Sequence, residues 1–168
     1  MSYLDQLGRA HRWLKRLEDA SSHTNDINDP VPTEKHEEYE DFLYAFFQNC
    51  WHLKDWILSD AGAPKGLREA VRKMDEQSTI VPLMLCSSVA NGSKHLRSGR
   101  DPKRRAKTVG EILIDIDPKG DSQTFYTYKV VDDNGTSHEA IALARQALDE
   151  WEKIIRKNAE KNAIAPSV

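Results

Sequence analysis

The stretch that decides the fold covers residues 33–59 and reads TEKHEEYEDFLYAFFQNCWHLKDWILS. Thr33 is a suitable N-cap, and the acidic residues of the first turn favour the positive end of a helix dipole. Apolar side chains then recur at three- and four-residue intervals, the period of one helix face. These apolar residues are Tyr39, Phe42, Leu43, Phe46, Cys50, Leu53 and Ile57. We therefore predict a long helix over 33–59 that lies in the centre of the core.

The rest of the chain carries further helical patterns and one segment with the period of a strand. Helices are predicted over about 2–20, 65–76, 78–96 and 137–160, with a loop at 21–32. A capping box formed by Thr136 and Glu139 opens the last helix. Residues 109–131 alternate around the turn DPKGD, which predicts a β-hairpin that must pack on helices. We expect one mainly α domain over 1–168, a helical bundle of about five helices with one inserted β-hairpin and a frayed tail at 161–168.

The composition of the chain limits the classes of protein to which it can belong. The 168 residues carry a net charge of −3 and are 39% hydrophobic, which fits a soluble globular protein. No apolar run approaches the length of a membrane helix, and the N-terminus lacks the apolar region of a signal peptide. We expect a cytoplasmic protein with no membrane partner.

Several kinds of site are excluded by spacing. Cys50 and Cys86 form no CxxC pair, which rules out a zinc ribbon or a thioredoxin-like motif, and we interpret both as buried, inert thiols. The phosphate-loop, dinucleotide-binding, nucleophile-elbow and HExxH motifs are all absent from the sequence. We expect no cofactor.

The first candidate site consists of Asn91, Lys94 and His95, near the end of the predicted helix 78–96. Asn91 and His95 lie one helical turn apart, so the amide and the imidazole can act on the same ligand. An imidazole titrates near neutrality and is the usual general acid or base. The alternative is that Asn91 and His95 bridge helices through hydrogen bonds inside the bundle.

A polar residue, three spacers and a His near the end of a core helix resemble the motif of the HEPN superfamily. These proteins are helical bundles, often dimeric, and many are metal-independent ribonucleases. Three strings, FFQNCWHLKDWI (46–57), ANGSKHL (90–96) and HEAIALARQALDEWEKII (138–155), are similar to a group of uncharacterised bacterial and phage-associated helical proteins. The resemblance implies a setting in phage–host conflict or in a toxin–antitoxin pair.

If the motif is that of a ribonuclease, the resemblance implies that Asn91 holds the phosphate and that His95 acts as the general acid or base. It also implies that the site lies at a dimer interface. The family motif also contains an Arg, and this chain has Ala90 at that position. Lys94 or Arg97 would then have to supply the positive charge.

A second polar cluster consists of Asn49, His52 and Asp55 on the predicted helix 33–59. His52 and Asp55 are three residues apart, so a hydrogen bond between them would orient the imidazole. The cluster would face the first candidate site across the bundle. The alternative is a polar edge beside the core. No third ligand is placed by spacing for a metal ion, so we expect no metal site.

A basic segment follows the first candidate site. From Lys94 to Lys107 the chain has seven Lys or Arg and one Asp, and the candidate RNA-binding residues are Arg97, Arg100, Lys103, Arg104, Arg105 and Lys107. Such side chains neutralise phosphates. The alternatives are a solvated loop and contact with an acidic partner protein. We expect a HEPN-like, non-catalytic binding or structural module. The alternative is a metal-independent ribonuclease or RNA-binding protein that uses Asn91 and His95. The resemblance also allows a homodimer.

Overall fold

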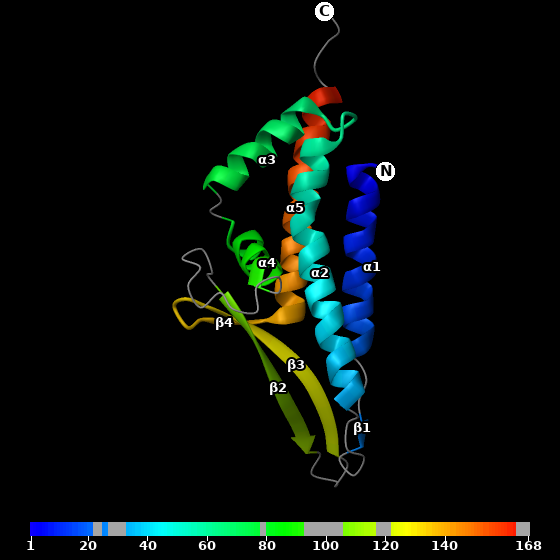
Figure 1. Cartoon of the computed structure of the whole chain (residues 1–168), viewed down its shortest axis with the longest axis vertical. Helices are drawn as coiled ribbons and strands as arrows, with labels where there is room; N and C mark the ends of the chain where they lie inside the picture. The colour runs from blue at the N-terminus through cyan, green and yellow to red at the C-terminus, as the bar shows by residue number, and fades with distance from the viewer. Residues whose placement is uncertain (22–24, 27–32, 78–79, 93–105, 117–121, 164–168) are drawn as a thin grey trace, which may run out of the picture.

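The computed structural model describes residues 1–21, 25–26, 33–77, 80–92, 106–116 and 122–163. Within these residues the chain forms five helices and a small antiparallel sheet (Figure 1), which confirms the predicted mainly α bundle with an inserted β-hairpin. The helices are α1 (Tyr3–Ser21), α2 (Thr33–Ser59), α3 (Lys65–Gln77), α4 (Val81–Gly92) and α5 (Ala140–Ala163).

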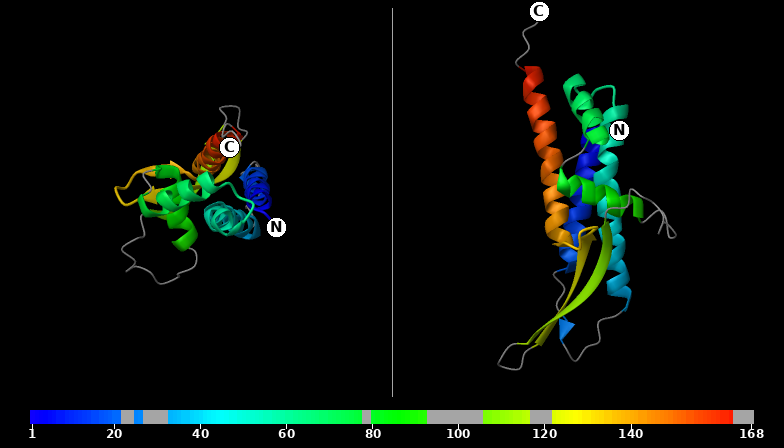
Figure 2. Two further views of the ribbon diagram at one scale, coloured as in Figure 1. Left: turned by 90° about the horizontal axis from the view of Figure 1, so that it is seen from above. Right: turned by 90° about the vertical axis from the view of Figure 1, so that its left-hand side faces the viewer.

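Helix α2 has the predicted bounds and the predicted central place. It packs against α1 along one side and against α4 on another, and it also contacts α3 and α5. Because neighbours surround it, the buried face is wider than the predicted stripe and includes Phe47, which meets Phe46 edge-on at 5.3 Å between ring centroids. The long helices α1, α2 and α5 lie side by side, while α3 packs on α5 near its C-terminal end (Figures 1 and 2).

Helix α4 begins at Val81, three residues later than the predicted start at 78. The main-chain oxygen of Ile80 accepts the N–H groups of Leu83 and Met84, so the first turn forms around Pro82, which has no N–H to donate. The predicted end of this helix, residues 93–96, lies outside the described residues.

The hairpin consists of β2 (Ala106–Ile116) and β3 (Ser122–Asp132), paired antiparallel from Ala106↔Asp132 to Ile116↔Ser122. It extends beyond the end of the bundle where α1 ends and α2 begins (Figure 2). On its other edge β3 pairs with β1 (Asn25–Asp26), so the predicted loop at 21–32 contains two strand residues. Tyr128 of β3 stacks on Tyr39 of α2 at 5.1 Å, which fixes the hairpin to the helices.

Helix α5 begins at Ala140, and the prediction that it starts at 137 as a Thr136–Glu139 capping box is wrong. Ser137–Glu139 form a short strand, β4, that pairs with β3, so these residues are extended. The carboxylate of Glu139 accepts the N–H groups of Ile141 at 2.9 Å and Ala142 at 2.5 Å. Glu139 therefore caps the helix itself. At the other end α5 continues through Ala163, so residues 161–163 are helical where we expected fraying, and 164–168 lie outside the described residues.

A tight turn joins β3 to β4 and explains why Thr136 does not cap. The side-chain Oδ1 of Asp132 accepts the N–H groups of Asn134 at 2.9 Å and Thr136 at 2.8 Å. Gly135 adopts φ 81°, a conformation that glycine reaches without steric cost. The turn thus holds the backbone of Thr136 and directs the chain into β4.

Candidate functional site

Asn91 lies in the last turn of α4, and its side chain is exposed. Its Nδ2 donates to Oγ of Ser87, one turn earlier, at 3.4 Å. The proposed partners Lys94 and His95 lie outside the described residues, as do Arg97, Arg100, Lys103, Arg104 and Arg105. Lys107 is placed by its backbone in β2, opposite Val131. The catalytic and RNA-binding roles of these residues stay predictions.

The position that precedes Asn91 is the one at which the resembling motif has Arg. Here it is Ala90, and its exposed fraction is 0%. Val89, beside it, is 3% exposed and Cys86, one turn earlier, is 0% exposed. A guanidinium at position 90 would be a buried charge in apolar surroundings, which is costly without a paired anion. The geometry of α4 therefore presents the amide of Asn91 to solvent but offers no place for a cation at the preceding residue.

Asn49 forms hydrogen bonds with other residues of the bundle. Nε2 of Gln6 on α1 donates to the main-chain oxygen of Asn49 at 2.8 Å and to its Oδ1 at 3.3 Å. Nδ2 of Asn49 donates to the main-chain oxygen of Ala45 at 2.7 Å. Gln6 is 2% exposed, so these bonds lie in a protected contact between α1 and α2.

The expectation that Asn49 faces the first candidate site across the bundle is wrong. Asn49 faces α1, whereas Phe47 contacts α4, because the thiol of Cys86 donates to the main-chain oxygen of Phe47 at 3.5 Å. An α-helix turns about 100° per residue, so these contacts occupy different sides of α2. His52 is half-buried and Asp55 is exposed, and the role predicted for that pair stays a prediction.

The structure places His138, to which the sequence assigned no role, beside Asp132. Nε2 of His138 on β4 lies 3.7 Å from Oδ2 of Asp132 at the end of β3. The hydrogen bond from the main-chain N–H of Thr136 is the largest cause that lowers the pKa of Asp132. The main-chain N–H of Asn134 and the side chain of His138 lower this pKa further. The Asp132 carboxylate therefore stabilises the β3–β4 turn through these hydrogen bonds. The sequence signal was the string DDNGTSH, in which Asp and Gly mark a tight turn and His follows it.

Tyr39 stacks on Tyr128 of β3 but offers no proton near neutrality. Its exposed fraction is 2%, and its hydroxyl has no hydrogen-bond partner within the described part of the chain. Burial, together with the nearby charge of Glu139 and the neighbouring Tyr128, raises the pKa of Tyr39 far above its usual value. The hydroxyl is therefore a neutral group inside the core.

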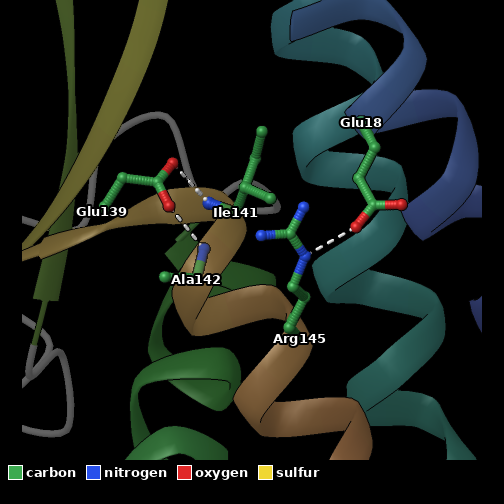
Figure 3. Close-up of polar contacts among 5 residues, drawn as sticks. All are labelled: Glu18, Glu139, Ile141, Ala142 and Arg145. Carbon is green, nitrogen blue, oxygen red and sulfur yellow. Dashed lines mark hydrogen bonds and ion pairs between the residues drawn. The ribbon is translucent and has the colours of Figure 1, made fainter.

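Polar side chains also meet at the contact between α1 and α5. Nε of Arg145 on α5 donates to Oε1 of Glu18 on α1 at 2.7 Å, and His11 meets Glu152 at 2.9 Å. Figure 3 shows Arg145 reaching from the first turns of α5 to Glu18, while Glu139 lies over the start of the same helix. These two contacts link α1 to α5.

The prediction that both cysteines are buried is confirmed, since each is 0% exposed. Burial and a direct interaction with the Cys50 thiol raise the pKa of the Cys86 thiol well above its usual value. Within the described ranges, no three His, Cys, Asp or Glu side chains gather as ligands for a metal ion. In that same part of the chain, no helix has the length and apolar character needed to cross a membrane.

Comparison of the chain with models of protein families, with curated proteins and with solved structures finds no match.

Proposed function

We propose that this chain is a non-catalytic binding or structural module with a HEPN-like helical layout. The observation that carries the proposal is the burial of Ala90 directly before Asn91. Cleavage of a phosphodiester develops negative charge that a positioned cation stabilises, and this contribution is often the largest single one in catalysis. Position 90 holds a methyl group packed in the core, so the motif residue that would supply that cation is missing.

The contacts of Asn49 support the same proposal. Its side chain and main-chain oxygen are engaged by Gln6 and Ala45 within the α1–α2 contact. An amide that already makes these bonds contributes to the packing of the helices rather than to a ligand. The second polar cluster thus loses its Asn as a reacting group.

The ligand of the proposed module is a polyanion that the basic segment recognises, with RNA as the first class to test and an acidic partner protein as the second. Binding is measured by fluorescence anisotropy of a labelled single-stranded RNA in EDTA, and the RNA is checked for full length on a gel afterwards. The proposal predicts binding that weakens with added salt, with the RNA intact. Replacing Arg104 and Arg105 by Gln should weaken binding, whereas the matched pair Arg72→Gln and Lys73→Gln, exposed on α3, should not.

A second candidate, a metal-independent ribonuclease, is favoured by one observation. The amide of Asn91 is exposed at the end of α4, four residues before His95 in the sequence. In this candidate Lys94 or Arg97 supplies the charge, and a homodimer places two sites together. Light scattering measures the oligomeric state, and RNA cleavage that depends on His95 separates the two candidates.

A further inference from the structure

The two cysteines of the chain meet across the contact between α2 and α4. The Cys86 thiol donates to the main-chain oxygen of Phe47 at 3.5 Å, which places it over the turn of α2 that runs from Phe47 to Cys50. The thiols of Cys50 and Cys86 also interact directly. Both are free and both are fully buried.

We infer that Cys50 and Cys86 form a redox-active pair that closes to an intramolecular disulfide between α2 and α4. A disulfide needs the two Cβ atoms about 3.5–4.5 Å apart, and helices whose axes lie about 8–10 Å apart bring the side chains between them into contact. The chain contains two cysteines in all, so neither has a competing partner within the chain.

The co-reactant is a small-molecule disulfide such as glutathione disulfide. The thiolate of one cysteine attacks a sulfur of the reagent, forming a mixed disulfide and releasing one glutathione thiolate. The thiolate of the second cysteine then attacks the protein sulfur of that mixed disulfide and releases the second glutathione. The two thiol protons end on the two released glutathione molecules, so the protein pair is oxidised by two electrons and the reagent is reduced by two.

Burial sets the rate of this reaction. The thiolate is the attacking species, and the buried Cys86 thiol is held in its protonated form. The reagent reaches the pair when α4 separates locally from α2. We expect slow closure at neutral pH and faster closure as the pH rises, because the thiolate fraction grows.

Closure would tie the middle of α4 to α2. Asn91 lies five residues after Cys86 on the same helix, so the cross-link would restrict the movement of the element that carries it. A cross-link also reduces the conformational entropy of the unfolded chain, which stabilises the folded protein.

The test treats the folded, full-length protein with glutathione disulfide at mildly alkaline pH. Free thiols are then counted in denaturant, and the mass of the intact protein is measured. The inference predicts that both thiols disappear, that the mass falls by two hydrogen atoms, and that a peptide joining Cys50 to Cys86 is recovered. The protein should remain monomeric in size on a non-reducing gel. Its thermal unfolding midpoint should rise and return to the starting value after reduction.

Three results would overturn the inference. They are thiols that persist in the folded protein, a glutathione adduct on each cysteine without a link, and a link that forms only when the reagent acts on urea-unfolded protein. As a control, Cys86→Ala should give a single mixed disulfide at Cys50 and no rise in the unfolding midpoint. The wild-type measurements decide the question by themselves if this variant does not fold.

Discussion

Gln6 donates two hydrogen bonds from Nε2 to Asn49, at 2.8 Å to the main-chain oxygen and at 3.3 Å to Oδ1. The two residues lie on α1 and α2, and this contact occupies the protected seam between the helices. A polar pair at this position fixes which residues of the two helices oppose each other. Asn49 therefore belongs to the scaffold that positions the rest of the molecule.

Gln6→Ala should lower the free energy of unfolding by about 1–3 kcal/mol, because it removes both bonds and leaves the polar atoms of Asn49 in the seam. Asn49→Ala removes the Oδ1 acceptor and keeps the main-chain oxygen, so in a double-mutant cycle with Gln6→Ala the two effects should be partly non-additive. Chemical denaturation measures each value. The control Gln146→Ala changes an exposed residue of α5 and should stay within about 0.5 kcal/mol of wild type. Fully additive losses would show that the side-chain bond from Gln6 to Oδ1 of Asn49 is not energetically coupled.

Replacing Glu139 should weaken the start of α5. Glu139→Ala removes the acceptor for the N–H groups of Ile141 and Ala142 and should cost about 1 kcal/mol. Thr136→Ala is the matched comparison, since the bond made at that residue comes from its main-chain N–H. Thermal unfolding should rank Glu139→Ala below Thr136→Ala in midpoint. The reverse order would support the capping box that the sequence suggested.

The stability contributed by Asp132 should depend on pH. Its folded-state pKa is lowered, first by the N–H of Thr136, so the charged form is favoured in the folded protein. The contribution is therefore present above the unfolded-state pKa of about 3.9 and is lost as the pH falls through the folded-state pKa. The unfolding midpoint of Asp132→Asn should lie below that of wild type at pH 7, and the gap should close in acid. Asp133→Asn, at an exposed neighbouring position, is the control. A gap that stays constant with pH would contradict this account.

Tyr39 provides a test of packing without hydrogen bonding. Its buried hydroxyl lacks a partner within the described residues, while its ring stacks on Tyr128 at 5.1 Å. Tyr39→Phe keeps the ring and removes the unpaired hydroxyl, so the free energy of unfolding should be unchanged or higher. Tyr39→Ala should lower it by about 3–5 kcal/mol. A large loss in Tyr39→Phe would show that the hydroxyl has a partner.

The sequence predicted the elements whose signals are local. The bounds of α2 follow from Thr33 and from a long helical period, and the hairpin follows from alternation around a turn. The start of α5 was predicted at 137 because the capping box is a local pattern. Ser137–Glu139 instead pair with β3, and the local pattern contains no sign of this tertiary contact. At Ser137–Glu139, where the local and the tertiary signals disagreed, strand pairing decided the structure.

For the candidate site, the sequence identified the polar residues but not the neighbouring helix that each of them faces. Spacing placed Asn49 and Asn91 on helices that do contact each other. It did not reveal that Asn49 faces α1, because a face pattern does not say which neighbour covers it. The proximity of His138 to Asp132 was equally hidden, since it depends on the β3–β4 turn that brings the two strands together.

The most direct test of the non-catalytic function is a cleavage time course with a mixed RNA pool in the presence of EDTA. Wild type, Asn91→Ala and His95→Ala are compared with a sample that contains no protein, and the thermal unfolding midpoint of each variant is measured in the same buffer. The proposed function predicts that the RNA keeps the same length distribution in all four samples. Cleavage by the wild type that disappears in His95→Ala, with the unfolding midpoint unchanged, would contradict it and identify a metal-independent ribonuclease.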